Sequence, residues 1–168
     1  MKIEQAGEEK FPEILEIYSS ARDFMRECGN GEQWKSAYPP RELVESDIKK
    51  GNLYTVTDCG EILCVFYEDF GEDADYRSIY EGEWRTKAPY GIIHRIAVSN
   101  RARGRGVSAI VFSHVLEKYG SVRIDTHRNN IPMQRALAKF GFERAGIIYI
   151  RGGEERVAYE ISKSKSSL

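Results

Sequence analysis

One continuous segment, residues 92–108, constrains the fold of this chain more than any other part of the sequence. It begins with IIHRIAV, which is rich in apolar and β-branched residues and is typical of a buried strand. An arginine-rich turn with two glycines follows, and apolar residues at helical spacing begin at Val107. Strand, glycine turn and helix in this order direct free backbone N–H groups and the positive end of a helix toward one point, which attracts phosphate.

The glycine turn alone does not decide between a phosphate site and a plain structural connection. Gly104 and Gly106 permit positive φ and a close approach to the backbone, while Arg103 and Arg105 supply donors that match phosphate oxygens. The sequence contains no Walker-type run of Gly-x4-Gly-Lys-Ser/Thr. A dinucleotide fingerprint fits formally if Ala109 is its last position, but no further βαβ repeats with glycine turns follow.

Two blocks of the sequence resemble the GNAT family of N-acetyltransferases. Residues 103–108, RGRGVS, are similar to the family's acyl-CoA-binding motif Arg/Gln-x-x-Gly-x-Gly/Ala, with Ser108 where glycine or alanine is usual. Residues 130–142 are similar to the family's asparagine, helix and Gly-Phe ending. The blocks and their flanking strands cover the second half of the chain, and the resemblance implies a GNAT-like acyl-CoA N-acyltransferase fold with acetyl-CoA as acyl donor.

The resemblance also implies which residues hold acetyl-CoA. They belong to the strand, the glycine turn with the start of its helix, and the asparagine of the second block: Ile96, Ala97, Val98, Arg103, Gly104, Arg105, Gly106, Val107, Ser108 and Asn130. Asn130 is also a preferred N-cap residue ahead of Pro132, and the two roles are compatible.

Periodicity and turn residues predict an α/β (α+β) chain, with a mixed, mostly antiparallel central sheet flanked by helices. The resemblance implies the same element order. The segment 71–90 is polar and aromatic and receives no element. The expected strands are 2–5, 53–57, 62–70, 91–98, 122–126, 146–150 and 156–161, and the expected helices are 12–28, 40–51, 107–119 and 132–140.

Length and composition set the remaining expectations. A chain of 168 residues predicts one domain, here 1–162, followed by a short disordered tail, 163–168. A net charge of −1 provides no overall field for nucleic acid or an anionic membrane, and no apolar run reaches the roughly 18 residues of a membrane span. Three cysteines without metal-ligand spacing predict no metal and a reducing, cytoplasmic location. A homodimer is compatible with all of this.

Acyl transfer to an amine requires a neutral amine, whose free pKa is about 10.4 if it resembles lysine, so a base is expected in the site. Strict strand alternation places His94 on one face with Ile96 and Val98. In the resembling family an acid or histidine on this face serves as base in several members, which favours His94. A core histidine bonded to a backbone carbonyl is the equal alternative. Glu81 or Glu83 could act through water, or could be ordinary solvated loop residues.

The sequence says less about which residues line the acceptor pocket and which group protonates the leaving thiolate. Trp34, Tyr38 and Trp84 are loop aromatics that could line an acceptor pocket, an interface or the core. Many members of the resembling family protonate the departing thiolate with a tyrosine seven residues after the asparagine, and this chain has Leu137 there. Solvent, or one of Tyr90, Tyr119 and Tyr149, would have to replace it.

We therefore predict an acetyl-CoA-dependent N-acetyltransferase in which the primary amine of a small molecule or peptide attacks the thioester directly. The alternatives are a non-catalytic acyl-CoA-binding or regulatory module of the same fold, and an interaction domain whose glycine–arginine turn binds RNA. The identity of the acceptor and the length of the acyl group are not encoded in any pattern we recognise.

Overall fold

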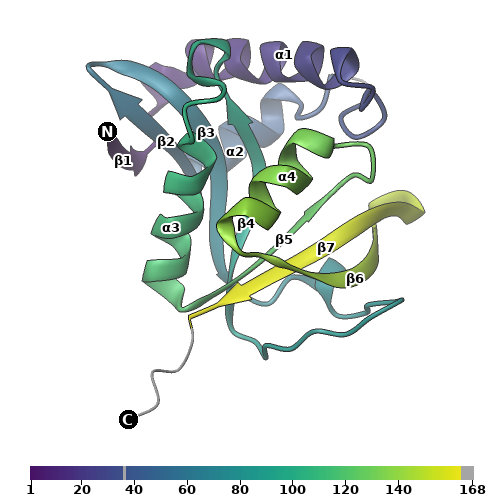
Figure 1. Cartoon of the computed structure of the whole chain (residues 1–168). Coiled ribbons are helices and arrows are strands. Elements are labelled where there is room, and N and C mark those ends of the chain that lie inside the picture. Colours follow the sequence, from purple (N-terminus) through teal and green to yellow (C-terminus); the bar gives the residue numbers. More distant parts are fainter. Residues whose placement is uncertain (36, 164–168) are drawn as a thin grey trace. The chain divides into compact units, whose positions relative to one another are not determined.

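The computed structural model describes residues 1–35 and 37–163 (Figure 1), which form two compact units. The first unit consists of Met1–Glu68 and His94–Val111, and the second of Asp69–Ile93 and the described residues from Phe112 onward. The predicted strand β4 (Tyr90–Val98) and helix α3 (Val107–Tyr119) are both present, and each contributes residues to both units. The two units are described in turn.

The first unit is a layer of strands with two helices. β1 (Lys2–Gln5) pairs antiparallel with β2 (Leu53–Asp58), β2 pairs antiparallel with β3 (Glu61–Gly71), and the order is β1-β2-β3-β4. Apolar residues at helical spacing on α1 (Phe11–Glu27) and α2 (Arg41–Lys49) form a core with the strands. This core contains Ala6, Ile14, Ile17, Tyr18, Ala21, Val44, Ile48, Leu53, Ile62, Val65 and Ala97.

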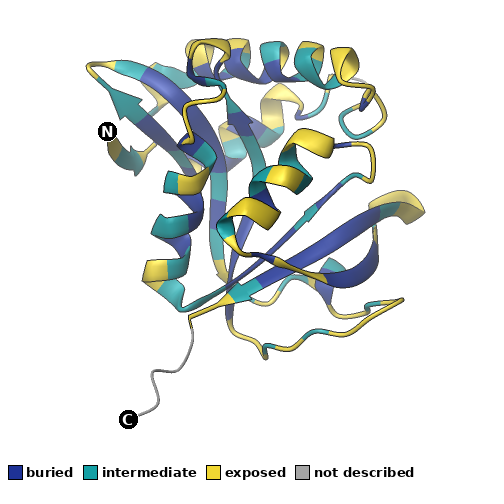
Figure 2. Cartoon of the chain, in the orientation of Figure 1, coloured by how far each residue is buried: buried dark blue, intermediate teal, exposed yellow. Residues whose placement is uncertain are grey.

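The second unit contains a parallel pairing between two strands. β4 pairs parallel with β5 (Ser121–Thr126), which pairs antiparallel with β7 (Glu154–Ser162), and β7 pairs antiparallel with β6 (Glu143–Ile150). The helix α4 (Ile131–Phe140) lies between β5 and β6 in the chain, and most of β7 is buried (Figure 2). The aromatic rings of Phe112, Phe140 and Phe142 pack edge-on or tilted at 5.2–5.9 Å.

The segment between β3 and β4, for which the sequence predicts no element, is held in the second unit by buried polar contacts. Its only regular piece is the short 3-10 helix η2 (Ala74–Tyr76). Both carboxylate oxygens of the buried Glu160 accept hydrogen bonds from the segment, at 2.6 Å from the Arg85 amide and at 2.8 and 3.2 Å from the Thr86 hydroxyl and amide. Arg123, the partner of Glu160 across the β5–β7 ladder, donates to the carbonyl of Thr86. A chain segment without periodicity is thus ordered by charge-assisted hydrogen bonds.

The predicted order of strands and helices is confirmed, and the fold is α+β with mixed, mostly antiparallel strand pairing. The bounds differ from the predicted ones by a few residues; β6, for example, begins at Glu143. Lys163, predicted to start the tail, donates its amide to Gly120 at 2.9 Å, whereas 164–168 lie outside the described residues.

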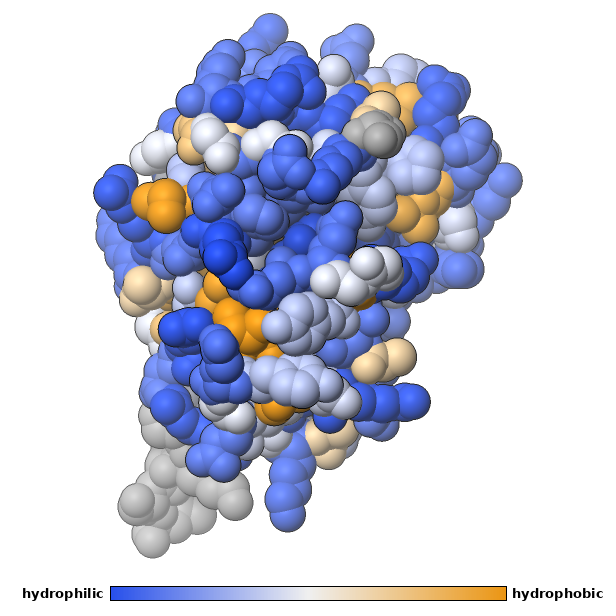
Figure 3. Space-filling view, turned by 90° about the vertical axis from the view of Figure 1, so that its right-hand side faces the viewer, coloured by the Kyte–Doolittle hydropathy of each residue, from blue (hydrophilic) through white to orange (hydrophobic). Residues whose placement is uncertain are grey.

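The described surface has few large apolar side chains. One face is mostly hydrophilic with small separate apolar groups (Figure 3), and the exposed large hydrophobic residues are Met1, Phe70, Tyr80, Ile131 and Tyr149. No helix in the described part of the chain is long and apolar enough to cross a membrane.

The close approach of the β3–β4 segment to β6 generates a stability prediction. Tyr80 and Ile147 form an antiparallel bridge, and a Cβ added at Gly82 would lie 1.9 Å from the carbonyl oxygen of Ala145. We expect Gly82→Ala to lower the free energy of unfolding by about 1–3 kcal/mol, because the backbone must move. Gly31→Ala is the control, since its Cβ would meet only Arg26 Cγ at 3.4 Å. Denaturant melts of both variants measure the difference, and equal stability would contradict the prediction.

Candidate active site

The main chain of β4 changes course at Arg95. This residue has φ +48°, in the left-handed region that residues other than glycine rarely occupy. The side chains of His94 and Arg95 both contact the ring of Tyr67, His94 by stacking at 5.9 Å and the Arg95 guanidinium at 4.5 Å. The expectation of strict alternation along this strand is therefore wrong at this point, because the left-handed residue interrupts the pleat.

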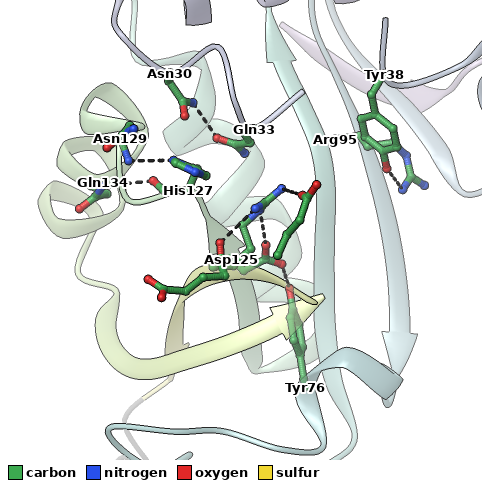
Figure 4. A network of polar contacts seen from close by, with 12 residues as sticks. Asn30, Gln33, Tyr38, Tyr76, Arg95, Asp125, His127, Asn129 and Gln134 are labelled. Carbon is green, nitrogen blue, oxygen red and sulfur yellow. Dashed lines mark hydrogen bonds and ion pairs between the residues drawn. The ribbon is translucent and has the colours of Figure 1, made fainter. Parts of the chain in front are cut away.

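Arg95 is the centre of a buried polar cluster. Its guanidinium donates from Nε and Nη2 to Oδ2 of Asp47, on α2, at 3.0 and 2.7 Å. Its Nη1 donates to the hydroxyl of Tyr38 at 3.5 Å (Figure 4), and its carbonyl accepts a hydrogen bond of 3.0 Å from the hydroxyl of Tyr18, on α1. The Arg95 and Asp47 side chains are only 9% and 5% exposed, so each charge depends on the other for compensation.

The ionisation of this cluster is governed by burial and by the ion pair. Burial raises the pKa of Tyr18 far above its usual value, so its hydroxyl remains a donor. Burial also raises the pKa of the Asp47 carboxyl, against the opposing effect of Arg95. Burial alone would lower the pKa of Arg95, but the Asp47 carboxylate beside it makes the net change an increase.

Two of the predicted acceptor residues join this cluster. The ring of Trp34 lies 5.7 Å from that of Tyr18 and 6.2 Å from that of Tyr38. The predicted residues Trp34, Tyr38 and His94 are therefore linked, through Tyr18 and Arg95, within one unit. Their predicted roles stay predictions.

Sequence reasoning missed the residues that link them. Tyr18 looks like one more apolar position of α1, and Asp47 like one more polar position of α2. The one usable signal in the sequence was the charged Asp47 directly before the apolar Ile48. In the structure both side chains are buried, which is unusual for an aspartate.

The glycine turn has the geometry that a phosphate site requires. Gly104 and Gly106 have φ +76° and +74°, and a Cβ added at either would meet no heavy atom within 4 Å. The turn is anchored on both sides by the buried side chains of Ala102 and Val107. Because the first amides of an α-helix have no partner within the helix, those of Val107 and Ser108 complete the set of donors. The predicted residues 96–98 and 103–108 all lie in the first unit.

The arginines of the turn have different surroundings. Arg103 donates to the carbonyl of Ser20 at 3.1 Å and lies over the ring of Phe24 at 3.9 Å, and burial lowers its pKa. Arg103 thus ties the turn to α1, which the sequence did not indicate. Arg101 pairs with Glu61 at 2.8 Å, whereas Arg105 is exposed.

The second predicted block lies in the second unit. Asn130 is buried and caps α4, since its Oδ1 accepts a hydrogen bond of 3.2 Å from the amide of Met133. The preceding turn is braced by Gln134, whose side-chain amide donates to the carbonyls of His127 and Arg128 at 3.3 and 2.7 Å. Leu137 is fully buried.

Glu83 and Trp84 also belong to the second unit. The indole N–H of Trp84 donates to the carbonyl of Tyr76 at 2.8 Å, and the Arg123 guanidinium lies 4.1 Å from the ring centroid. Through these contacts Trp84 packs within this unit, and its predicted role in the acceptor site stays a prediction. Glu83 is exposed on the rim of a hollow of about 270 Å³ that Arg85 also lines. The described residues include no group of three or more His, Cys, Asp and Glu side chains placed to bind a metal ion.

Comparison with known proteins identifies the family. The model of the acetyltransferase (GNAT) family matches residues 31–142. A GNAT-family acetyltransferase from Streptococcus agalactiae superposes with a TM-score of 0.88 at 30% identity, covering 98% of this chain and 96% of that one. No curated protein matches the sequence.

Two further solved structures share the fold. A protein described as histone acetyltransferase HPA2 and related acetyltransferase, from Corynebacterium glutamicum, has a TM-score of 0.67 at 19% identity and covers 99% and 98% of the two chains. A ribosomal-protein-alanine N-acetyltransferase from Brucella melitensis has a TM-score of 0.66 at 16% identity and covers 97% and 100%. The motif, the matched family model and the similarity to the Streptococcus agalactiae structure lead to one conclusion: this chain belongs to the GNAT family of acetyltransferases.

Proposed function

We propose that this acetyltransferase transfers the acetyl group of acetyl-CoA to the primary amine of a small molecule or peptide by direct attack, with residues 1–162 acting as one catalytic domain. The observation that carries the proposal is the glycine turn before α3. Both of its glycines have positive φ and open space on the side where a side chain would otherwise project. A pyrophosphate can therefore approach the backbone amides at the positive end of a helix.

The chain's own residues divide the binding of acetyl-CoA between them. The amides of Gly104 and of residues 106–108 would hold the pyrophosphate, with the exposed side chain of Arg105 as a further donor, whereas the Arg105 amide already donates to the carbonyl of Ala102 at 3.2 Å. The main chain of β4 from Ile96 to Val98 would hold the pantetheine arm. Bound acetyl-CoA supplies the activated acyl group and a thiol leaving group.

His94 would remove a proton from the acceptor's ammonium group. The side chain is partly buried and stacked on Tyr67, so it is held in place without being sealed from water. A histidine imidazole is a common general base in enzymes. Glu83 is exposed and would act only through water.

One observation favours a non-catalytic acyl-CoA-binding module as the second candidate. Leu137, where a proton donor to the thiolate is usual in the family, is fully buried. The test is a panel of amines, polyamines, aminoglycosides and peptides assayed for free-thiol release from acetyl-CoA, next to calorimetry with acetyl-CoA. Binding with turnover of any acceptor supports the transferase, binding without turnover supports the module, and absence of binding rejects both.

Gly106→Ala tests the phosphate site. The new methyl would occupy the space through which the pyrophosphate approaches, and we expect the Kd for acetyl-CoA to rise about 10- to 100-fold, as for the loss of hydrogen bonds to a charged group. Gly120→Ala is matched for strain, since Gly120 has φ +80° and equally open surroundings. Calorimetry should show a normal Kd for that control; an equal rise in both variants would remove the site from this turn.

His94→Ala tests the base. At neutral pH we expect the rate of thiol release with the best acceptor to fall about 100-fold or more, the usual range for loss of a general base. The loss should shrink as the pH rises toward the amine's own pKa, because free amine then forms without help. His114→Ala, on α3, serves as control. A loss of equal size at every pH would assign His94 to packing.

Leu137→Tyr tests how the thiolate leaves. Because Leu137 is fully buried, we expect the larger ring to lower stability by about 1–3 kcal/mol and to give no gain in the maximal rate. A thiol with a pKa of about 8.5 leaves as an anion without a dedicated donor. Thermal melts and saturation kinetics measure both effects, and a clear increase in kcat would show that protonation limits the native enzyme.

A further inference from the structure

Arg95 differs from the other left-handed residues of this chain. Among the described residues, the other non-glycine residues with positive φ are Ala37, Cys59 and Glu81, and all three are exposed residues outside the strands. Arg95 lies inside β4, directly between His94 and Ile96. A left-handed conformation is unfavourable for a residue that carries a side chain, so the surroundings must compensate for it.

Two contacts hold Arg95 from opposite ends. The Tyr18 hydroxyl donates to its carbonyl at 3.0 Å, which fixes the orientation of the peptide group between residues 95 and 96. Asp47 accepts two hydrogen bonds from the guanidinium, at 2.7 and 3.0 Å, which fixes the side chain. Tyr18 and Asp47 are almost fully buried, on two different helices, so neither can follow Arg95 if it relaxes.

We propose that Tyr18 and Asp47 are positioning residues for acyl transfer. They hold Arg95 in the left-handed conformation and thereby set the direction of the β4 main chain, from His94 to Val98, toward the acetyl group of bound acetyl-CoA. This inference rests on the proposed function, because it needs acetyl-CoA to bind along β4. Glycine at position 95 would permit the same positive φ without strain, but it would permit other backbone conformations as well. An arginine that is held at its carbonyl and at its guanidinium restricts the main chain to this one conformation.

The test compares two variants, each of which lacks the hydroxyl of one buried tyrosine. Tyr18→Phe removes the bond to the Arg95 carbonyl, and Tyr76→Phe, the control, removes a bond of 2.7 Å to Asp125 in the second unit (Figure 4). Both side chains are 1% exposed. The readouts are the Kd for acetyl-CoA from calorimetry and the ¹³C carbonyl shift of bound [1-¹³C]acetyl-CoA, which reports how the protein polarises the thioester without any acceptor.

We expect the Kd to stay at the wild-type value in Tyr76→Phe and to rise by less than about tenfold in Tyr18→Phe, since the amides of the glycine turn are untouched while the β4 main chain that would hold the pantetheine arm changes its course. The carbonyl shift should move toward that of free acetyl-CoA in Tyr18→Phe and remain at the wild-type value in Tyr76→Phe. Asp47→Asn, which weakens the pair with Arg95 but keeps its shape, should move the shift in the same direction. If Tyr18→Phe fails to fold, the carbonyl shift of Asp47→Asn alone tests the proposal.

A double-mutant cycle adds a second criterion. Arg95→Gly, combined with Asp47→Asn so that no buried carboxylate is left unpaired, removes the strain that Tyr18 compensates, so Tyr18→Phe should change the carbonyl shift less in that background than in the wild type. The inference would be overturned if Tyr18→Phe changed the carbonyl shift equally in both backgrounds, or if Tyr18→Phe and Asp47→Asn both kept the wild-type carbonyl shift. Either result would leave the proposed function standing. A wild-type protein that does not bind acetyl-CoA would instead reject the proposed function, and this inference with it.

Discussion

Strand β4 combines three structural features within nine residues, and the buried charge pair between Arg95 and Asp47 lies at the irregular one. Its first residues pair in parallel with β5, its last ones lead into the glycine turn, and between them the chain departs from regular strand geometry at Arg95. An unpaired guanidinium at this depth would be costly, and so would an unpaired carboxylate. The pair therefore ties the course of β4 to the packing of α2.

The same physical principle operates in the second unit with a different result. There the carboxylate of the buried Glu160 accepts hydrogen bonds from the backbone amide of Arg85 and from the amide and hydroxyl of Thr86, and these bonds hold a segment that has no regular structure. In the first unit the buried charges shape a strand next to the candidate base. Buried polar groups thus stabilise irregular backbone in both units, and in the first they do so where chemistry is proposed.

The two features that the sequence predicted well are local ones. The strand, the glycine turn and α3 were predicted from a single continuous segment, because periodicity and the positive φ of Gly104 and Gly106 depend only on neighbouring residues. The cap of α4 by Asn130 was predicted for the same reason. The surroundings of His94 were not predicted from the sequence. The expected alternation of side chains assumed a regular strand, and no local signal indicated that Arg95 adopts a left-handed backbone conformation.

The sequence by itself determined the family, the order of the elements and the place of the glycine turn before α3, since each depends on motifs or on contacts between near neighbours. Only the tertiary structure decided what surrounds the candidate base. Tyr18 and Asp47 stand 77 and 48 positions from Arg95, and their side chains meet it because α1 and α2 bury their apolar faces against the strands. Contacts of that kind follow from packing, in which every residue's neighbours depend on all the others, and no sequence pattern specifies them one at a time.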